Sequence, residues 1–143
     1  MKLAIDGGTP VRSREQAHVQ WPVWGEEEKA NLRAVVESGV WSYSGPFERR
    51  LLAEWREYVG TNHALAAANG TVTLQIALEA LGVGYGDEVI LPGLTWQATA
   101  AVVVDVNAVP VLVDVEPDTW CIDPVAVEAA ITDRTAAIIV VNL

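Results

Sequence analysis

Cysteine and lysine are scarce in this 143-residue sequence, in which Cys121 is the single cysteine and Lys2 and Lys29 are the lysines. One cysteine excludes an internal disulfide framework and is typical of a reducing compartment. Cys121 lies in the apolar segment TWCID, which favours a buried structural thiol over a nucleophile. We therefore expect a cytoplasmic protein without disulfides.

Long apolar runs and basic clusters are also missing. No run approaches the roughly 20 apolar residues that cross a membrane, and the start, MKLAIDGGTPVR, lacks the apolar core of a signal peptide. The net charge of −10 disfavours nucleic acid and anionic membranes, which bind clustered Lys and Arg. Basic residues come together in RSR at 12–14 and ERR at 48–50, which we interpret as solvated surface. We expect neither nucleic acid nor a membrane as a partner.

Apolar residues are plentiful, at 51% of the chain, which is enough to form one core. The chain of 143 residues is too short for two ordinary domains. Residues 1–60 are interpreted as an amino-terminal arm, irregular to residue 24, with flanking helices. The helices are predicted in GEEEKANLRAVVESG (25–39) and PFERRLLAEWREYVG (46–60), each stopped by a glycine. The run Glu26–Glu28 suits the positive end of the first helix dipole and needs no metal to explain it.

Residues 61–143 change rhythm and alternate between two kinds of pattern. Apolar runs predict strands at 63–68, 87–92, 109–115 and 136–143, and helical periodicity predicts helices at 71–81, 95–105 and 124–131. Val102–Val104 fit a strand equally well. Such alternation predicts an α/β fold with helices around a mostly parallel sheet.

The segment Asn69-Gly70-Thr71 follows one of these predicted strand ends, where open parallel sheets bind ligands. A helix that begins there presents the N–H groups of Gly70, Thr71 and Val72, which can hold a phosphate group. A steric interpretation is also open, because glycine permits the backbone angles of a tight strand-to-helix turn. On spacing alone the steric interpretation is the stronger one, since one Gly-Thr step is weaker than a full glycine-rich fingerprint.

Trp96, in the segment 93–97, follows another strand end. Its indole face can lie against an aromatic ring, or it can fill the core between sheet and helix, which is the favoured interpretation when Trp96 is taken alone. No G-x-G-x-x-G opens a predicted helix, so a nucleotide-binding Rossmann domain is disfavoured.

The order of the motifs WSYSGP, YVGTNHALAAANGTVTLQIAL and GVGYGDEVILPGLTWQATAAVVVDVNAVPVLVDVEPDTWCIDP resembles the amino-terminal part of the DegT/DnrJ/EryC1/StrS family of sugar and aminocyclitol aminotransferases. The resemblance runs from about Gly7 to Leu143. It implies the fold-type-I large domain of a pyridoxal 5′-phosphate enzyme, incomplete at its carboxyl end. It also implies a homodimer that transfers an amino group from glutamate or glutamine to a keto-sugar or keto-cyclitol in secondary metabolism, including antibiotic biosynthesis.

The resemblance assigns roles to residues of this sequence. Gly70 and Thr71 match the Gly-Thr step that binds the cofactor phosphate, with Val72 next to it, and Trp96 matches the aromatic that stacks on the pyridine ring. Val72 and Thr73 replace the more usual small pair after Gly-Thr. Gln97 follows the stacking aromatic at a variable position and is a candidate contact with substrate or cofactor, although a surface glutamine is equally consistent. The candidates for the rim of the site are Trp41, Ser44, Gly45 and Pro46.

The chemistry of the family needs a lysine that bonds to the cofactor and a carboxylate on its ring nitrogen. Neither Lys2 nor Lys29 follows a predicted strand, and the family supplies both groups from later in the chain. We therefore expect the front of a longer enzyme, with no catalytic residue in these 143 residues and no activity of its own. Three alternatives remain: a split enzyme whose second chain supplies the lysine, a sugar dehydratase relative with histidine in its place, and a non-catalytic binding module.

Two segments bear on the substrate class. The segments PGLTWQATA and PDTWCIDP resemble aminocyclitol-type relatives in antibiotic pathways more than lipopolysaccharide ones. A nucleotide-linked sugar would need cations for its diphosphate, for which Arg12, Arg14 and Arg134 are the candidates, whereas a cyclitol would need none.

Overall fold

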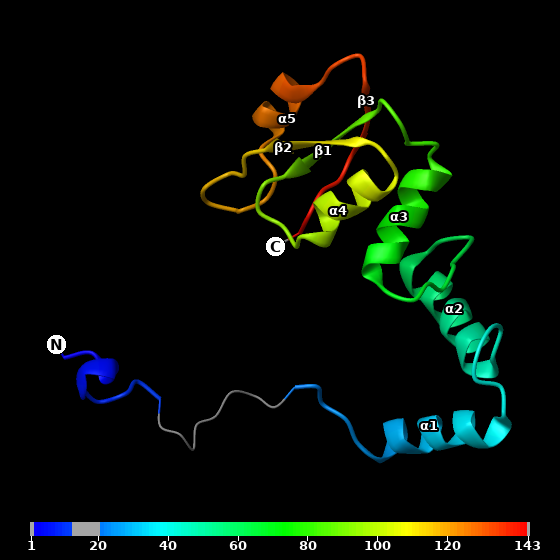
Figure 1. Cartoon of the computed structure of the whole chain (residues 1–143). Coiled ribbons are helices and arrows are strands. Elements are labelled where there is room, and N and C mark those ends of the chain that lie inside the picture. Colours follow the sequence, from blue (N-terminus) through cyan, green and yellow to red (C-terminus); the bar gives the residue numbers. More distant parts are fainter. Residues whose placement is uncertain (1, 13–20, 143) are drawn as a thin grey trace. The chain divides into compact units, whose positions relative to one another are not determined.

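The fold comes from a computed structural model that describes residues 2–12 and 21–142. The described chain divides into two compact units, Met1–Ala64 and Leu65–Leu143 (Figure 1). Residues 13–20 lie outside the described residues, and with them Arg14 and part of the predicted arm.

The first unit contains a short 3₁₀ turn, η1 (Ala4–Asp6), and two α-helices, α1 (Glu26–Ser38) and α2 (Pro46–Val59). Gly39 follows α1 with φ of 69° and Gly60 follows α2 with φ of 75°. Both angles lie in the left-handed region, where a residue without a Cβ ends a helix at little cost. Both predicted helices and both glycine stops are confirmed.

The acidic start of α1 has the structural role that its position predicts. The Glu28 carboxylate accepts a hydrogen bond from the Gly25 N–H at 2.6 Å. Backbone N–H groups, first that of Glu28 itself and then that of Gly25, hold the pKa of Glu28 below its ordinary value. Lys29 pairs with Glu26 at 2.7 Å and also lies 4.8 Å from the ring centre of Trp24. Lys29 is thus engaged on the surface of α1.

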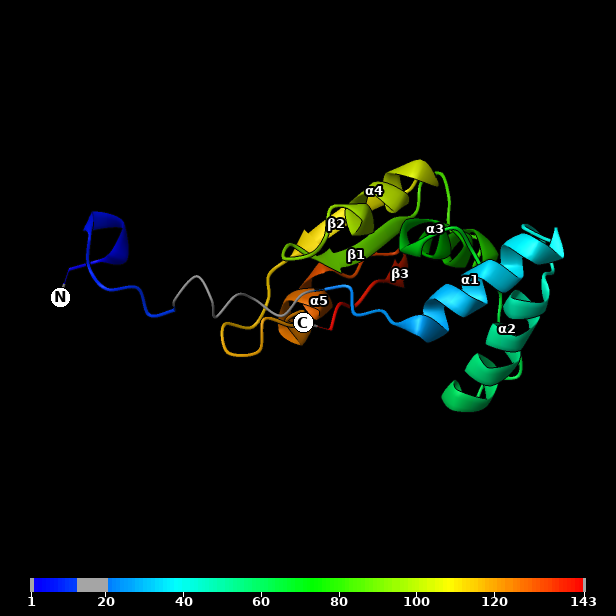
Figure 2. The ribbon, with the colours of Figure 1, turned by 90° about the horizontal axis from the view of Figure 1, so that it is seen from below.

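The second unit alternates helices with strands that form a three-stranded parallel sheet in the order β2-β1-β3. Figure 2 shows α4 and α5 on opposite sides of the strands. The elements in chain order are α3 (Gly70–Ala80), β1 (Glu88–Pro92), α4 (Ala98–Asp105), β2 (Val109–Val113), α5 (Pro124–Ala130) and β3 (Thr135–Ile138). The predicted α/β fold is confirmed, and Val102–Val104 belong to a helix.

The core of this unit lies between the sheet and the pair α3 and α4. Leu78 of α3 packs in one buried cluster with Val89 and Leu91 of β1 and with Val102 and Val103 of α4. Val89 and Leu91 alternate along β1, so they face the same side of the sheet. Burying each such side chain contributes about 1.5–3 kcal/mol, which makes this cluster the main source of stability in the unit.

Three sequence predictions are wrong in detail. The predicted strand at 63–68 has no ladder partner among the described residues, and Leu65 within it is exposed. The last strand ends at Ile138 instead of continuing to residue 143, because the pairing with β1 stops there. Cys121 is half-buried, since it lies on a surface turn closed by the short bridge between Val115 and Ile122.

None of the helices within residues 2–12 and 21–142 combines the length and the apolarity needed to span a membrane.

Candidate cofactor site

The start of α3 is built by Asn69. Its backbone is extended, and its side-chain oxygen accepts the N–H of Val72 at 3.1 Å, which caps the helix. The Thr73 hydroxyl donates to the Gly70 carbonyl at 2.7 Å and closes the same turn. Of the three N–H groups predicted to face a phosphate, that of Val72 is therefore already engaged.

The N–H groups of Gly70 and Thr71 and the Thr71 hydroxyl have no acceptor among the described residues. Gly70 and Thr71 are exposed, and a Cβ at Gly70 would meet nothing within 4 Å. The first turn of a helix carries unpaired donors and a partial positive charge, and both favour an anion. The turn thus offers open donors for a phosphate group, and its residues fit the phosphate of pyridoxal phosphate.

The second predicted contact, Trp96, lies in the loop after β1. The Gly93 N–H donates to the carbonyl of Val113 at 2.8 Å, which ties the start of this loop to the end of β2. The hydroxyls of Thr95 and Thr99 are 2.8 Å apart, and Thr99 is buried. Trp96 between them is 80% exposed, so it does not fill the core of this chain.

The topology brings these two segments to one edge of the sheet. The loop with Trp96 follows the carboxyl end of β1. The short connection 81–87 joins the end of α3 to the start of β1, and α3 packs on the sheet through Leu78. Because an 11-residue helix is about as long as a five-residue strand, the start of α3 lies toward the carboxyl edge of β1. Gln97, also exposed, opens α4 at the same edge.

The predicted rim residues belong to the first unit, around the turn between α1 and α2. Trp41, Gly45 and Pro46 line a hollow of about 250 Å³, whereas Ser44 is not among its lining residues. The Trp41 indole donates to the Val36 carbonyl at 3.1 Å, and Gly45 is buried. Ser44 has φ of 58°, and its N–H donates to Glu48 at 2.7 Å. Hydrogen bonds within the first unit therefore hold this turn.

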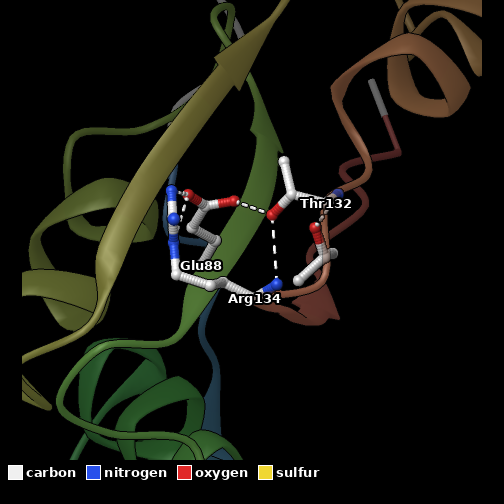
Figure 3. A network of polar contacts seen from close by, with 4 residues as sticks. Glu88, Thr132 and Arg134 are labelled. Atoms are coloured by element: carbon white, nitrogen blue, oxygen red, sulfur yellow. Dashed lines mark hydrogen bonds and ion pairs between the residues drawn. The ribbon is translucent and has the colours of Figure 1, made fainter.

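Sequence reasoning missed a polar network at the opposite, amino end of β1 (Figure 3). Glu88 is buried, accepts the Thr132 hydroxyl at 2.5 Å and pairs with Arg134. The hydrogen bond from Thr132, followed by that from Arg134, holds the pKa of Glu88 below its ordinary value against the opposing effect of burial. Arg134, a candidate for a substrate diphosphate, is thus already paired with a carboxylate of its own chain. The network was not predictable because its partners are far apart in the sequence.

The structure shows no group of three or more His, Cys, Asp or Glu side chains arranged for a metal within the described ranges.

Comparison with known proteins gives a consistent assignment. Residues 22–143 match the model of the DegT/DnrJ/EryC1/StrS aminotransferase family. The chain is 51% identical to an L-glutamine:2-deoxy-scyllo-inosose aminotransferase of Streptoalloteichus tenebrarius, over 99% of this chain and 34% of that protein. It thus spans about a third of the length of the curated relatives that it matches.

Solved structures share the fold. The crystal structure of 3-amino-5-hydroxybenzoic acid synthase matches with a TM-score of 0.83 and 38% identity, over 87% of this chain and 32% of that one. A putative sugar aminotransferase from Streptococcus pneumoniae, solved in its PLP form, matches with a TM-score of 0.77 and 35% identity, over 82% of this chain and 30% of that one. Sequence and fold agree that the chain belongs to the DegT/DnrJ/EryC1/StrS aminotransferase family.

Proposed function

We propose that this chain is the amino-terminal part of a pyridoxal-phosphate-dependent aminotransferase of aminocyclitol biosynthesis. The whole protein would move the amino group of L-glutamine to a keto-cyclitol of the 2-deoxy-scyllo-inosose type. The observation that carries the proposal is the open start of α3, where Gly70 and Thr71 keep free donors at the carboxyl edge of the sheet. The identity of 51% to an aminotransferase with that named activity supports the donor and the substrate.

In this proposal each residue at the edge has a physical task. Asn69 fixes the first turn of α3, so that the N–H groups of Gly70 and Thr71 point out of the helix before any ligand arrives. The Thr71 hydroxyl adds a donor, and the adjacent Val72 supports the turn. Trp96 supplies a broad exposed face for the pyridine ring, and Gln97 lies next to it as a candidate contact with substrate or cofactor.

Pyridoxal phosphate, when bound, supplies an electron sink that lets an amino group pass from a donor to a ketone. The residues of this chain would bind and orient it. Lys29 is held by Glu26 on α1, which argues against a covalent role for it. In our proposal the lysine and the carboxylate for the ring nitrogen belong to the part of the whole protein that corresponds to the region of the relatives that this chain does not cover.

The rim and the assembly belong to the same proposal. Trp41, Ser44, Gly45 and Pro46 would border the mouth of an active site in a homodimer, as the family resemblance implies. The single half-buried cysteine suits the reducing cytoplasm, where we place the protein. The alternatives of a dehydratase and a non-catalytic module receive less support, because relatives with about 50% sequence identity to this chain are named aminotransferases.

A binding experiment on the purified chain tests the candidate cofactor site formed by Gly70, Thr71 and Trp96. The probe is pyridoxine 5′-phosphate, which has the ring and phosphate of the cofactor but no aldehyde to react with lysines. We expect saturable quenching of tryptophan fluorescence. Thr71→Val and Trp96→Ala should each weaken binding by about tenfold, since one loses a hydrogen bond to a charged group and the other a stacking face.

Matched controls keep the test specific. Thr9→Val removes an exposed threonine hydroxyl, and Trp55→Ala removes a half-exposed tryptophan of α2, so neither should change the affinity. Equal losses in the controls and in the site variants would contradict this site, as would the absence of saturable binding to the folded wild-type chain.

A further inference from the structure

A hollow of about 360 Å³ beside α2 gathers cationic side chains in an acidic protein. It is lined by Arg49, Leu52, Arg56, His63 and Ala64. Its volume lies at the small end of the roughly 300–1,000 Å³ range of ligand pockets. The chain has 19 acidic and 9 basic residues, so two arginines facing one hollow are not expected from composition.

The sequence of α2 explains how the hollow forms. Arg49 and Arg56 are about two helical turns apart and lie on the same face of α2. The helix ends at Gly60, where the N–H groups of Gly60 and Thr61 both donate to the Arg56 carbonyl, at 2.9 and 3.1 Å. The Thr61 hydroxyl then donates to the His63 carbonyl at 3.1 Å. These bonds return the chain to the arginine face and place His63 at the hollow.

The two arginines keep unused donors. Arg49 donates through Nη1 to the backbone carbonyl of Ser44, and Arg56 donates through Nε to the Leu52 carbonyl at 3.3 Å. Neither forms an ion pair with a carboxylate in the described part of the chain, whereas Arg50 on the same helix pairs with Glu54 at 2.6 Å. Guanidinium groups present donors in a planar fork that matches phosphate and carboxylate oxygens.

We propose that this hollow of the first unit, formed by Arg49, Arg56 and His63, is a binding site for a phosphate group. Two guanidinium groups that have no carboxylate partner among the described residues, and that each keep unused donors, suit a doubly charged phosphate better than a single carboxylate. Hydrogen bonds from both guanidinium groups to backbone carbonyls restrain the two side chains, so less side-chain entropy is lost when an anion binds. The ligand is either inorganic phosphate or the phosphate group of a small monoester.

Titration of the isotope-labelled chain, followed by nuclear magnetic resonance at low ionic strength, tests the site with two probes. Inorganic phosphate and glycerol 3-phosphate should both saturate and shift the signals of Arg49, Arg56 and His63. Tighter binding of the ester would identify a monoester as the ligand, and equal or tighter binding of phosphate would identify the free ion. Shifts confined to Gly70 and Thr71 would overturn the proposal.

Variants of α2 complete the test. Arg49→Gln with Arg56→Gln should weaken phosphate binding by at least about tenfold, because charged hydrogen bonds are lost. Arg50→Gln removes the same charge from the same helix and should change the affinity less than twofold. If the double variant loses helical circular dichroism, Arg56→Gln alone replaces it, with a smaller loss expected. An equal effect of Arg50→Gln, or no effect of the arginine variants, would overturn the proposal.

Discussion

Asn69 controls how the start of α3 can meet a ligand. Its side chain engages the N–H of Val72 and leaves those of Gly70 and Thr71 open. The same hydrogen bond contributes to the stability of the fold, because a helix with a side-chain cap at its start is more stable than one without. Asn69 therefore links the stability of the second unit to the geometry of the proposed phosphate seat.

Replacing this cap gives the first prediction. Asn69→Ala should lower the free energy of unfolding by about 1 kcal/mol, the usual cost of a lost side-chain cap. Urea denaturation followed by circular dichroism measures it. Asn69→Ser should recover most of the loss, because serine also caps. Asn62→Ala, at an exposed position with no side-chain bond, is the control, and an equal loss there would show that the cap is not the cause.

At the scale of single residues, the sequence identifies which residues are candidates for the site better than it predicts their contacts. The Gly-Thr step and Trp96 are recognisable in the sequence. The structure shows open N–H donors at the Gly-Thr step and an exposed indole at Trp96. Their binding roles remain predictions. The engagement of Val72 by Asn69 does not follow from the sequence pattern, because an asparagine before a helix fits a turn position as well as the cap that accepts a backbone N–H.

Leu78 and Leu81 show how one helix separates core from surface. Leu78 is 3% exposed and Leu81 is 75% exposed, although both lie near the end of α3. Leu78→Ala should destabilise the chain by about 2–5 kcal/mol, because it removes transfer energy and leaves a cavity. Leu81→Ala should cost less than about 0.5 kcal/mol, as surface changes usually do. Thermal unfolding of the two variants gives the comparison, and similar losses would contradict the packing described for α3.

The network at the start of β1 ties one strand to the loop before another. Glu88 of β1 holds Thr132 and Arg134, which precede β3. A carboxyl group whose pKa is lower in the folded state than in the unfolded state stabilises the fold above its unfolded pKa. That stability is lost as the pH falls through the folded pKa. For Glu88 the ordinary value is 4.5, so the loss falls below this pH.

Glu88→Gln should therefore unfold at a lower urea concentration than the wild type near neutral pH. The difference should shrink as the pH is lowered below 4.5, because protonation removes the charge in the wild type as well. Urea midpoints measured across this range provide the check. Glu128→Gln, at an exposed position of α5, should show no such trend. A difference between Glu88→Gln and wild type that is independent of pH would contradict the charged network.

Element predictions succeeded where the signal is local. The glycines Gly39 and Gly60 end α1 and α2. The Asp123 side chain caps the start of α5 through the Val125 N–H at 2.8 Å, as its position before Pro124 predicts. The prediction of a strand at 63–68 is wrong, because an apolar run shows only that a strand can form. A strand also needs a neighbour, and the described chain offers it none.

The described part of the chain shares the fold of its family, and the chain spans about a third of its relatives' length. The alternation of strands and helices was enough to predict a parallel sheet, because each buried strand needs helices on both faces. Strand order and register were not predictable, since they depend on contacts between segments far apart in sequence. The family resemblance, carried by the order of motifs, supplied what periodicity could not.

The activity of the whole natural protein is the last prediction. Incubated with pyridoxal phosphate and treated with borohydride, it should carry one cofactor on a lysine outside residues 1–143, because Lys29 is paired with Glu26 on the surface of α1. It should also aminate 2-deoxy-scyllo-inosose with L-glutamine. Peptide mass spectrometry locates the adduct, and Lys2→Gln with Lys29→Gln is the control that should leave the activity unchanged. An adduct confined to Lys2 or Lys29, or a protein that binds the cofactor and aminates no ketone, would contradict the proposed aminotransferase.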